Sequence, residues 1–158
     1  MRTLLAILMV MLLTACESKP RGPVPIQADD ACASCRMAIS ERRYAAELLD
    51  PDGNLYKFDD IACMMRFAHS RGIQRSATRF YVTDYANGKD FIDASSAYFV
   101  RLKSSVSSPM ASGIVAFRNA ATAAQASNQK NGEAFTFDEL WAKDINEMTA
   151  NRDERLKR

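Results

Sequence analysis

The sequence predicts an α+β fold, in which two ββαβ units pack together into one small domain. The chain has 158 residues, of which 47% are hydrophobic and 25% charged, as expected for a single globular domain. This composition excludes a disordered, collagen-like or multidomain chain. The same order of strands and helix occurs twice, and each helix starts at a similar motif, Phe58-Asp59-Asp60-Ile61-Ala62 or Phe117-Arg118-Asn119-Ala120-Ala121.

The first sixteen residues have the features of a bacterial lipoprotein signal. Arg2 supplies a positive charge, and the apolar run that follows is only about half the roughly 20 residues that a membrane-spanning helix needs. Because Leu13-Thr14-Ala15-Cys16 resembles a lipobox, we expect residues 1–15 to be removed and Cys16 to carry lipid. The alternative is an ordinary signal peptide with an incidental cysteine. We expect lipid to hold the protein at the periplasmic face of a bacterial membrane, and Glu17 after the cysteine favours the outer membrane.

A tether and a tail flank the predicted domain. The segment after Cys16 is polar and contains three prolines, which is typical of an extended linker. Six of the nine residues in 150–158 are charged, as in a solvated or frayed helix end. We therefore expect a lipidated N-terminus and tether at 16–29, a folded domain at 30–149 and a charged tail at 150–158.

The first unit is predicted to start with a β-hairpin, whose strands Ala38–Leu49 and Asn54–Phe58 flank an Asp-Pro-Asp-Gly turn. A helix follows over Asp59–Ser70, because its apolar residues recur at helical spacing. Gly72 can end this helix. A strand over Phe80–Tyr85 completes the unit.

The second unit repeats this order. Its predicted strands are Phe91, Tyr98–Lys103, Gly113–Phe117 and Glu133–Phe137. Its helix is the alanine-rich segment Ala120–Asn128, which is expected to close near Gly132. A last helix is predicted from Asp138 to about Met148.

Sulfur-containing side chains carry the chemistry of the predicted domain. With Cys16 committed to lipid, Cys32, Cys35 and Cys63 are left, an odd number for a compartment that tends to pair thiols. Met37 follows Cys35 by two residues and would share its face in an extended segment, while Met110 follows a proline in a predicted loop. Thiolates and thioethers are soft donors that suit Cu(I), whereas Ca²⁺ and Mg²⁺ demand oxygen ligands.

These residues also have simpler interpretations. Cys32 and Cys35 could form a disulfide, and Met37 could fill the core, as most methionines do. Met64 and Met65 are consecutive on the predicted helix, so at least one of them should pack in the interior.

Several polar residues have simple interpretations too. His69 lies late on the helix and is most simply solvated, while Asp59 and Asp60 are most simply helix-capping charges, with a role beside the metal or in partner docking as the alternative. A formal net charge of +2 makes nucleic acid an unlikely partner, because phosphate recognition needs a concentrated basic surface. The chain has no nucleophile elbow or glycine-rich phosphate loop, and we expect no enzymatic activity.

A set of motifs carries a family resemblance that covers nearly the whole mature domain. The motifs are the lipobox, Cys32-x-x-Cys35-Arg36-Met37, Tyr56-Lys57-Phe58-Asp59-Asp60-x-x-Cys63-Met64, Tyr81-Val82-Thr83-Asp84-Tyr85 and Pro109-Met110-Ala111-Ser112-Gly113-Ile114-Val115-Ala116-Phe117. Together they resemble the NosL family, the accessory lipoproteins of nitrous oxide reductase. The resemblance implies the paired ββαβ fold and a chaperone that binds one Cu(I) and passes it toward the copper-sulfide centre of nitrous oxide reductase. It implies an accessory ABC-transporter complex as docking partner.

The resemblance also implies a ligand set. Carried over residue by residue, the Cys-x-Met core of the family corresponds to Cys35 and Met37, and its Pro-Met loop to Met110. We rank Cys32 second, as a further ligand or a redox partner of Cys35. Two more residues of the second rank are Cys63 and Met64.

Two other functions remain open. Cys32, Cys35, Cys63 and His69 could form a structural Cys₃His zinc site, in which the C-x-x-C pair supplies half of the ligands. A thiol oxidoreductase could instead use Cys32 and Cys35, although such a motif should follow a strand and open a helix, and here it precedes a hairpin.

Overall fold

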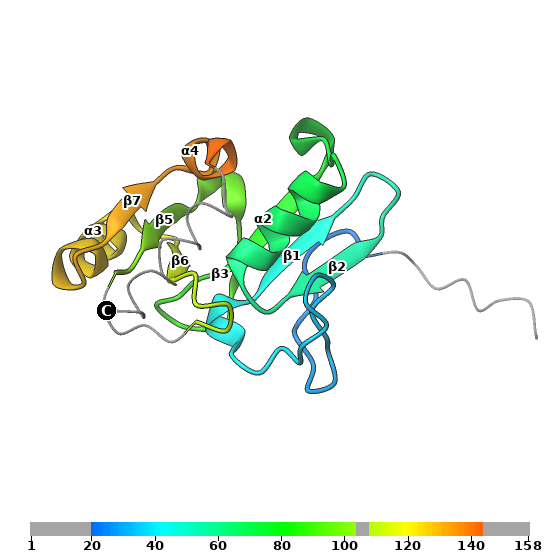
Figure 1. Cartoon of the computed structure of the whole chain (residues 1–158), viewed down its shortest axis with the longest axis horizontal. Coiled ribbons are helices and arrows are strands. Elements are labelled where there is room, and N and C mark those ends of the chain that lie inside the picture. Colours follow the sequence, from blue (N-terminus) through cyan, green and yellow to red (C-terminus); the bar gives the residue numbers. More distant parts are fainter. Residues whose placement is uncertain (1–19, 104–107, 144–158) are drawn as a thin grey trace, which may run out of the picture.

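The computed structural model describes residues 20–103 and 108–143, which form two antiparallel β-sheets covered by helices (Figure 1). The predicted signal peptide, Cys16 and the charged tail lie outside the described residues. Within the described part of the chain, no helix combines the length and the apolar character needed to cross a membrane. The predicted α+β class is confirmed.

The first sheet holds four strands in the order β2-β1-β3-β4. They are β1 (Ala46–Leu49), β2 (Leu55–Phe58), β3 (Arg79–Thr83) and β4 (Phe91–Asp93), and each pair of neighbours is antiparallel. Helix α2 (Ile61–Ser70) leaves the end of β2 and packs against β1 and β2. Its buried face fills the space over the sheet, as the spacing of its apolar residues predicts.

The second sheet holds three strands in the order β6-β5-β7. They are β5 (Tyr98–Arg101), β6 (Ile114–Phe117) and β7 (Glu133–Phe135), and helix α3 (Ala120–Gln129) packs on this sheet. In both units the strand after the helix pairs with the first strand of the hairpin, on the side away from the second. The two ββαβ units therefore share one topology.

The repeated sequence motif marks the same structural event in both units, the start of a helix. The Asp60 carboxylate accepts a hydrogen bond from the Ala62 N–H at 2.8 Å, and the Asn119 side chain accepts one from the Ala121 N–H at 2.8 Å. Each side chain satisfies a backbone donor that the first turn of a helix leaves unpaired.

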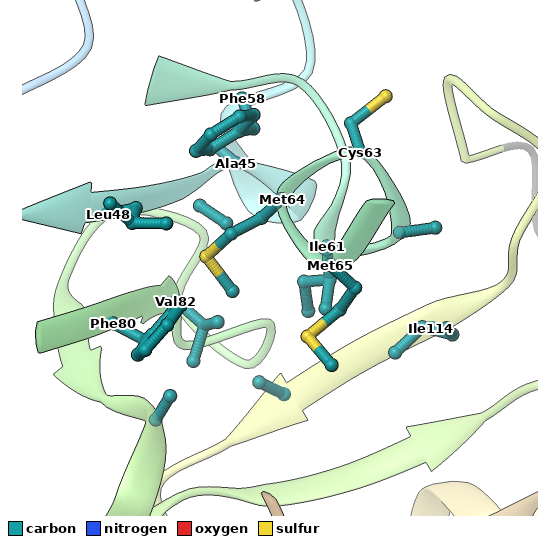
Figure 2. Close-up of a cluster of buried hydrophobic side chains, with 14 of the residues drawn as sticks. Ala45, Leu48, Phe58, Ile61, Cys63, Met64, Met65, Phe80, Val82 and Ile114 are labelled. Atoms are coloured by element: carbon teal, nitrogen blue, oxygen red, sulfur yellow. The ribbon is translucent and has the colours of Figure 1, made fainter. Parts of the chain in front are cut away.

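The two units share a core. Asp84 at the end of β3 forms a parallel bridge with Ala116 of β6, and the Tyr85 N–H donates to the Ala116 carbonyl at 2.8 Å. One cluster of buried side chains runs from α2 and β1 to β6 (Figure 2), where Met65 of α2 lies toward Ile114. The position of α2 therefore depends on both units.

Several predicted element boundaries differ from the structure, most of them by one or two residues, and two of the differences have a clear cause. The strand predicted over Ala38–Leu49 is regular only in β1, because Arg42–Tyr44 form a 3-10 turn that carries Tyr44 to within 5.6 Å of the Tyr85 ring. Phe137 does not extend β7. A capping box between Thr136 and Glu139 instead starts helix α4 at Phe137 (Phe137–Ala142). The end of the helix predicted to reach Met148 lies outside the described residues.

Part of the predicted tether packs against the first sheet. Ile26 is buried, and the Val24 N–H donates to the Glu47 carboxylate at 2.9 Å. Lys57 of β2 forms an ion pair with Asp30 at 2.6 Å. The residues just before the C-x-x-C motif thus form a strap against β1 and β2, and this strap leads the motif to the start of α2.

Candidate metal centre

The C-x-x-C motif lies in a tight loop at the edge of the first sheet. Ala31 and Ala38 form an isolated bridge that closes the loop. The Cys32 N–H donates to the Met37 carbonyl at 2.8 Å, and the Arg36 N–H donates to the Cys32 carbonyl at 3.0 Å. These bonds hold the two cysteines of the motif close together.

This loop is anchored to β2. The Ala33 N–H donates to the Lys57 carbonyl at 2.8 Å, one residue before β2 ends at Phe58. Because α2 starts directly after β2, the same anchor brings Cys32 and Cys35 to the first turn of the helix.

Four side chains from the loop and the helix start converge there. One ligand atom from each of Cys32, Cys35, Asp59 and Cys63 lies within 4.8 Å of the other three. Cys32, Asp59 and Cys63 are buried, and Cys35 is half-buried. We call these four residues the Cys₃Asp cluster.

Hydrogen bonds within the cluster orient its sulfur atoms. The Cys35 thiol donates to Asp59 Oδ2 at 3.4 Å, and the Cys35 N–H donates to Cys32 Sγ at 3.5 Å. Asp59 Oδ1 is buried and has no hydrogen-bond partner among the described residues. A buried carboxylate oxygen without a donor is costly unless a cation binds it, so Asp59 suits a metal ligand.

The three thiols of the cluster differ in the direction of their pKa shifts. A hydrogen bond from the Cys63 thiol lowers the pKa of Cys32, and the same contact raises the pKa of Cys63. Burial raises the pKa of Cys35. Cys32 is therefore the thiol that ionises most readily, and a metal that needs more than one thiolate must displace protons from the others.

Met37 and Cys35 do not share a face as the Cys-x-Met spacing predicts. Arg36 between them has a φ of 67°, a left-handed conformation that breaks the alternation of an extended strand. Cys35 consequently faces Asp59, while the Met37 side chain is 55% exposed. The surface beside the cluster thus presents a thioether to solvent.

The predicted Pro-Met loop lies at the start of the same helix. The Met110 N–H donates to Asp60 Oδ2 at 3.3 Å, and the Met110 side chain is half-buried against the shared core. Since Asp60 follows Asp59 directly, Met110 and the Cys₃Asp cluster are attached to one turn of the chain.

A family model for NosL matches residues 23–145, which includes both units and every cysteine of the cluster. The chain belongs to the NosL family. The crystal structure of the copper chaperone NosL from Shewanella denitrificans has a similar fold, with a TM-score of 0.67 and 24% sequence identity. The alignment covers 76% of this chain and 96% of that one. No curated protein sequence matches the chain.

Two residues considered from the sequence, Met64 and His69, lie away from the Cys₃Asp cluster. Met64 is fully buried and points with Met65 into the core, whereas Cys63 points away from it (Figure 2). The His69 ring packs on Trp141, with a centroid distance of 4.7 Å. The predicted Cys₃His group is therefore wrong, because the later turn of α2 places His69 elsewhere and Asp59 takes the fourth position.

Asp59 is the residue whose role the sequence analysis underestimated. The sequence suggests a capping charge or a role beside the metal or in partner docking, but Asp60 caps α2 and Asp59 faces the thiols. Helical spacing does not reveal this role, because Asp59 lies before the Asp60 cap and outside α2, and only its nearness to Cys63 in the sequence hints at it.

Proposed function

We propose that this member of the NosL family is a periplasmic Cu(I) chaperone, which delivers its cargo for assembly of the copper-sulfide centre of nitrous oxide reductase. The Cys₃Asp cluster beside the exposed Met37 is the observation that carries this proposal. Family membership and the fold shared with the Shewanella denitrificans copper chaperone support it. We further propose an accessory ABC-transporter complex as the docking partner.

The arrangement of donors suits transfer of a cargo metal. Cys35 is half-buried, so one thiol of the cluster is open to an approaching ligand, and Met37 is exposed next to it. Thioethers bind Cu(I) without losing a proton and do not form disulfides, which is useful outside the cytoplasm. Cu(I) held by Cys35, Met37 and Met110 would keep a coordination position free for an acceptor.

A structural zinc site is a second candidate, and Asp59 favours it. Cysteine thiolates and aspartate carboxylates are both ligands of tetrahedral Zn²⁺, while Cu(I) gains little from a hard carboxylate oxygen. The three thiols of the cluster are free, so the donor set is complete without reduction of a disulfide between described residues. A thiol oxidoreductase function has no comparable support.

Titration of the mature lipoprotein in detergent, under anaerobic reducing conditions, distinguishes these functions. We expect one tightly bound Cu(I) per chain by competition with a Cu(I)-specific chelator. Met37→Ala should weaken Cu(I) binding measurably and leave Zn²⁺ binding unchanged, because zinc does not use the thioether. Tight Zn²⁺ binding with no tight Cu(I) binding would replace the chaperone by the structural zinc protein.

Membrane attachment through Cys16 is also part of the proposal. Cys16→Ser, produced behind an ordinary cleavable signal peptide, should be found in the soluble periplasmic fraction, because each buried acyl CH₂ contributes about 0.8 kcal/mol to membrane binding and all acyl chains would be lost. Cu(I) affinity should stay at the wild-type value. Loss of Cu(I) binding in this variant would show that Cys16 is a metal ligand, and the lipid anchor would have to be abandoned.

A further inference from the structure

The loop that carries Met110 is held in one conformation by its own hydrogen bonds. We call residues 108–113 the Pro-Met loop. The Ala111 N–H donates to the Ser108 carbonyl at 2.8 Å, and the Gly113 N–H donates to the Ser108 hydroxyl at 3.0 Å. Ala111 and Gly113 both have positive φ angles, 58° and 69°. A loop of this shape places each side chain in a definite direction.

Asp60 links this loop to helix α2. Its Oδ1 accepts hydrogen bonds from the Ala62 N–H and from the Ser112 hydroxyl, both at 2.8 Å. Its Oδ2 accepts one from the Met110 N–H at 3.3 Å. Oδ1 thus caps the helix and also binds the loop through Ser112, whereas Oδ2 binds the loop backbone at Met110.

Asp60 is more deeply buried than a helix-capping residue has to be. The side chain is 0% exposed, whereas a capping residue requires one acceptor oxygen, which an exposed Ser, Thr or Asn also supplies. Asn119 caps α3 from an exposed position with a single bond of this kind. Burying a carboxyl group is costly, so the contacts to Ser112 and Met110 account for its location.

We propose that Asp60 is a positioning residue, which holds the backbone of Met110 at the start of α2, next to Asp59, so that its thioether is available as a ligand to the metal of the Cys₃Asp cluster. This inference rests on the proposed Cu(I) function. Asp60 is covalently next to Asp59 and starts the helix turn that carries Cys63, so one rigid connection sets the loop against the cluster. A ligand held in advance costs less conformational entropy when the metal binds.

Asp60→Asn tests this role without removing the helix cap. Asparagine keeps one carbonyl oxygen for Ala62 and Ser112, but its amide nitrogen cannot accept the Met110 N–H. We expect Cu(I) affinity of the full-length protein to fall roughly 10- to 100-fold, the range found for residues that orient metal ligands. Met110→Ala should give a similar loss, and the double variant should lose no more than either single variant. Zn²⁺ affinity, a readout of the cysteine cluster alone, should not change.

Two further variants make the test decisive. Asn119→Asp exchanges the same pair of side chains at the equivalent cap of α3 and should leave Cu(I) affinity unchanged. Ser112→Ala removes a loop contact of Asp60 without changing the cap, so it should lower Cu(I) affinity even if Asp60→Asn is too unstable to measure. Losses that add in the double variant, or Zn²⁺ affinity that falls in parallel, would reduce Asp60 to a structural residue. Cu(I) affinity unchanged in Met110→Ala would overturn the inference but not the chaperone function, whereas absence of Cu(I) binding in the wild-type protein would overturn that function.

Discussion

Replacing Cys35 by serine should weaken Cu(I) binding by more than about 100-fold, because loss of an outer residue that only orients a ligand already costs about 10- to 100-fold. Cys35 belongs to both possible donor sets, the Cys₃Asp cluster and the group formed with Met37 and Met110. It is also the most accessible of the three clustered cysteines. A serine hydroxyl at this position is a hard and poorly ionised donor for Cu(I).

The measurement is Cu(I) competition with a chelator, with Cys63→Ser as the matched control. Cys63 is fully buried on α2, whereas Cys35 is half-buried and open to an approaching ligand. We therefore expect Cys63→Ser to cause the smaller loss of Cu(I) affinity in a protein that retains its circular dichroism spectrum. Wild-type affinity in Cys35→Ser, together with lost binding in Cys63→Ser, would show that the buried cysteines hold Cu(I) and that Met37 takes no part.

Gly113→Ala should lower the free energy of unfolding by about 2–5 kcal/mol, since a left-handed alanine costs roughly 1–2 kcal/mol and overpacking roughly 1–3 kcal/mol. Gly113 has a φ of 69°, and a Cβ atom there would lie 2.6 Å from the Leu102 carbonyl oxygen. That oxygen belongs to the backbone, where the Leu102 N–H also donates to the Gly113 carbonyl at 2.9 Å. Neither partner can move without disturbing the start of β6.

Gly72→Ala is the control for this prediction, measured by chemical denaturation under the same conditions. Gly72 has a φ of 61°, but nothing lies within 4 Å of the added Cβ atom. The control should lose only the conformational cost, roughly 1–2 kcal/mol. Equal losses at the two positions would mean that the close approach of Leu102 to Gly113 is relieved by a small backbone shift.

Most of the secondary structure was predictable because its signals are local. The apolar spacing in Asp59–Ser70 and the motif at Asn119 each specify a helix and its start within a few residues. The predictions were least accurate where a distant contact decides the backbone. Tyr44 lies in a 3-10 turn because it packs on Tyr85 of the connection to the second unit, which no property of the segment before β1 indicates.

The sequence predicted the type of donor in the candidate site, but not which residues form it. The spacing of Cys32 and Cys35 indicated a pair of thiols that could share a metal, and their separation of three residues keeps them close in almost any turn. Cys63 and Asp59 join them only because the loop docks on β2 through Ala33.

The sequence by itself determined which donors are available to a metal, three thiols and several thioethers, and where the helices begin. Only the tertiary structure decided which donors meet. Asp59, and not His69, is the fourth residue of the cluster, because the start of α2 lies against the C-x-x-C loop and its end does not. Met37 faces solvent because Arg36 is left-handed, and Met110 approaches the helix because Asp60 binds its backbone. The type of a donor is a property of one residue, whereas the distance between two donors depends on packing between segments far apart in the chain.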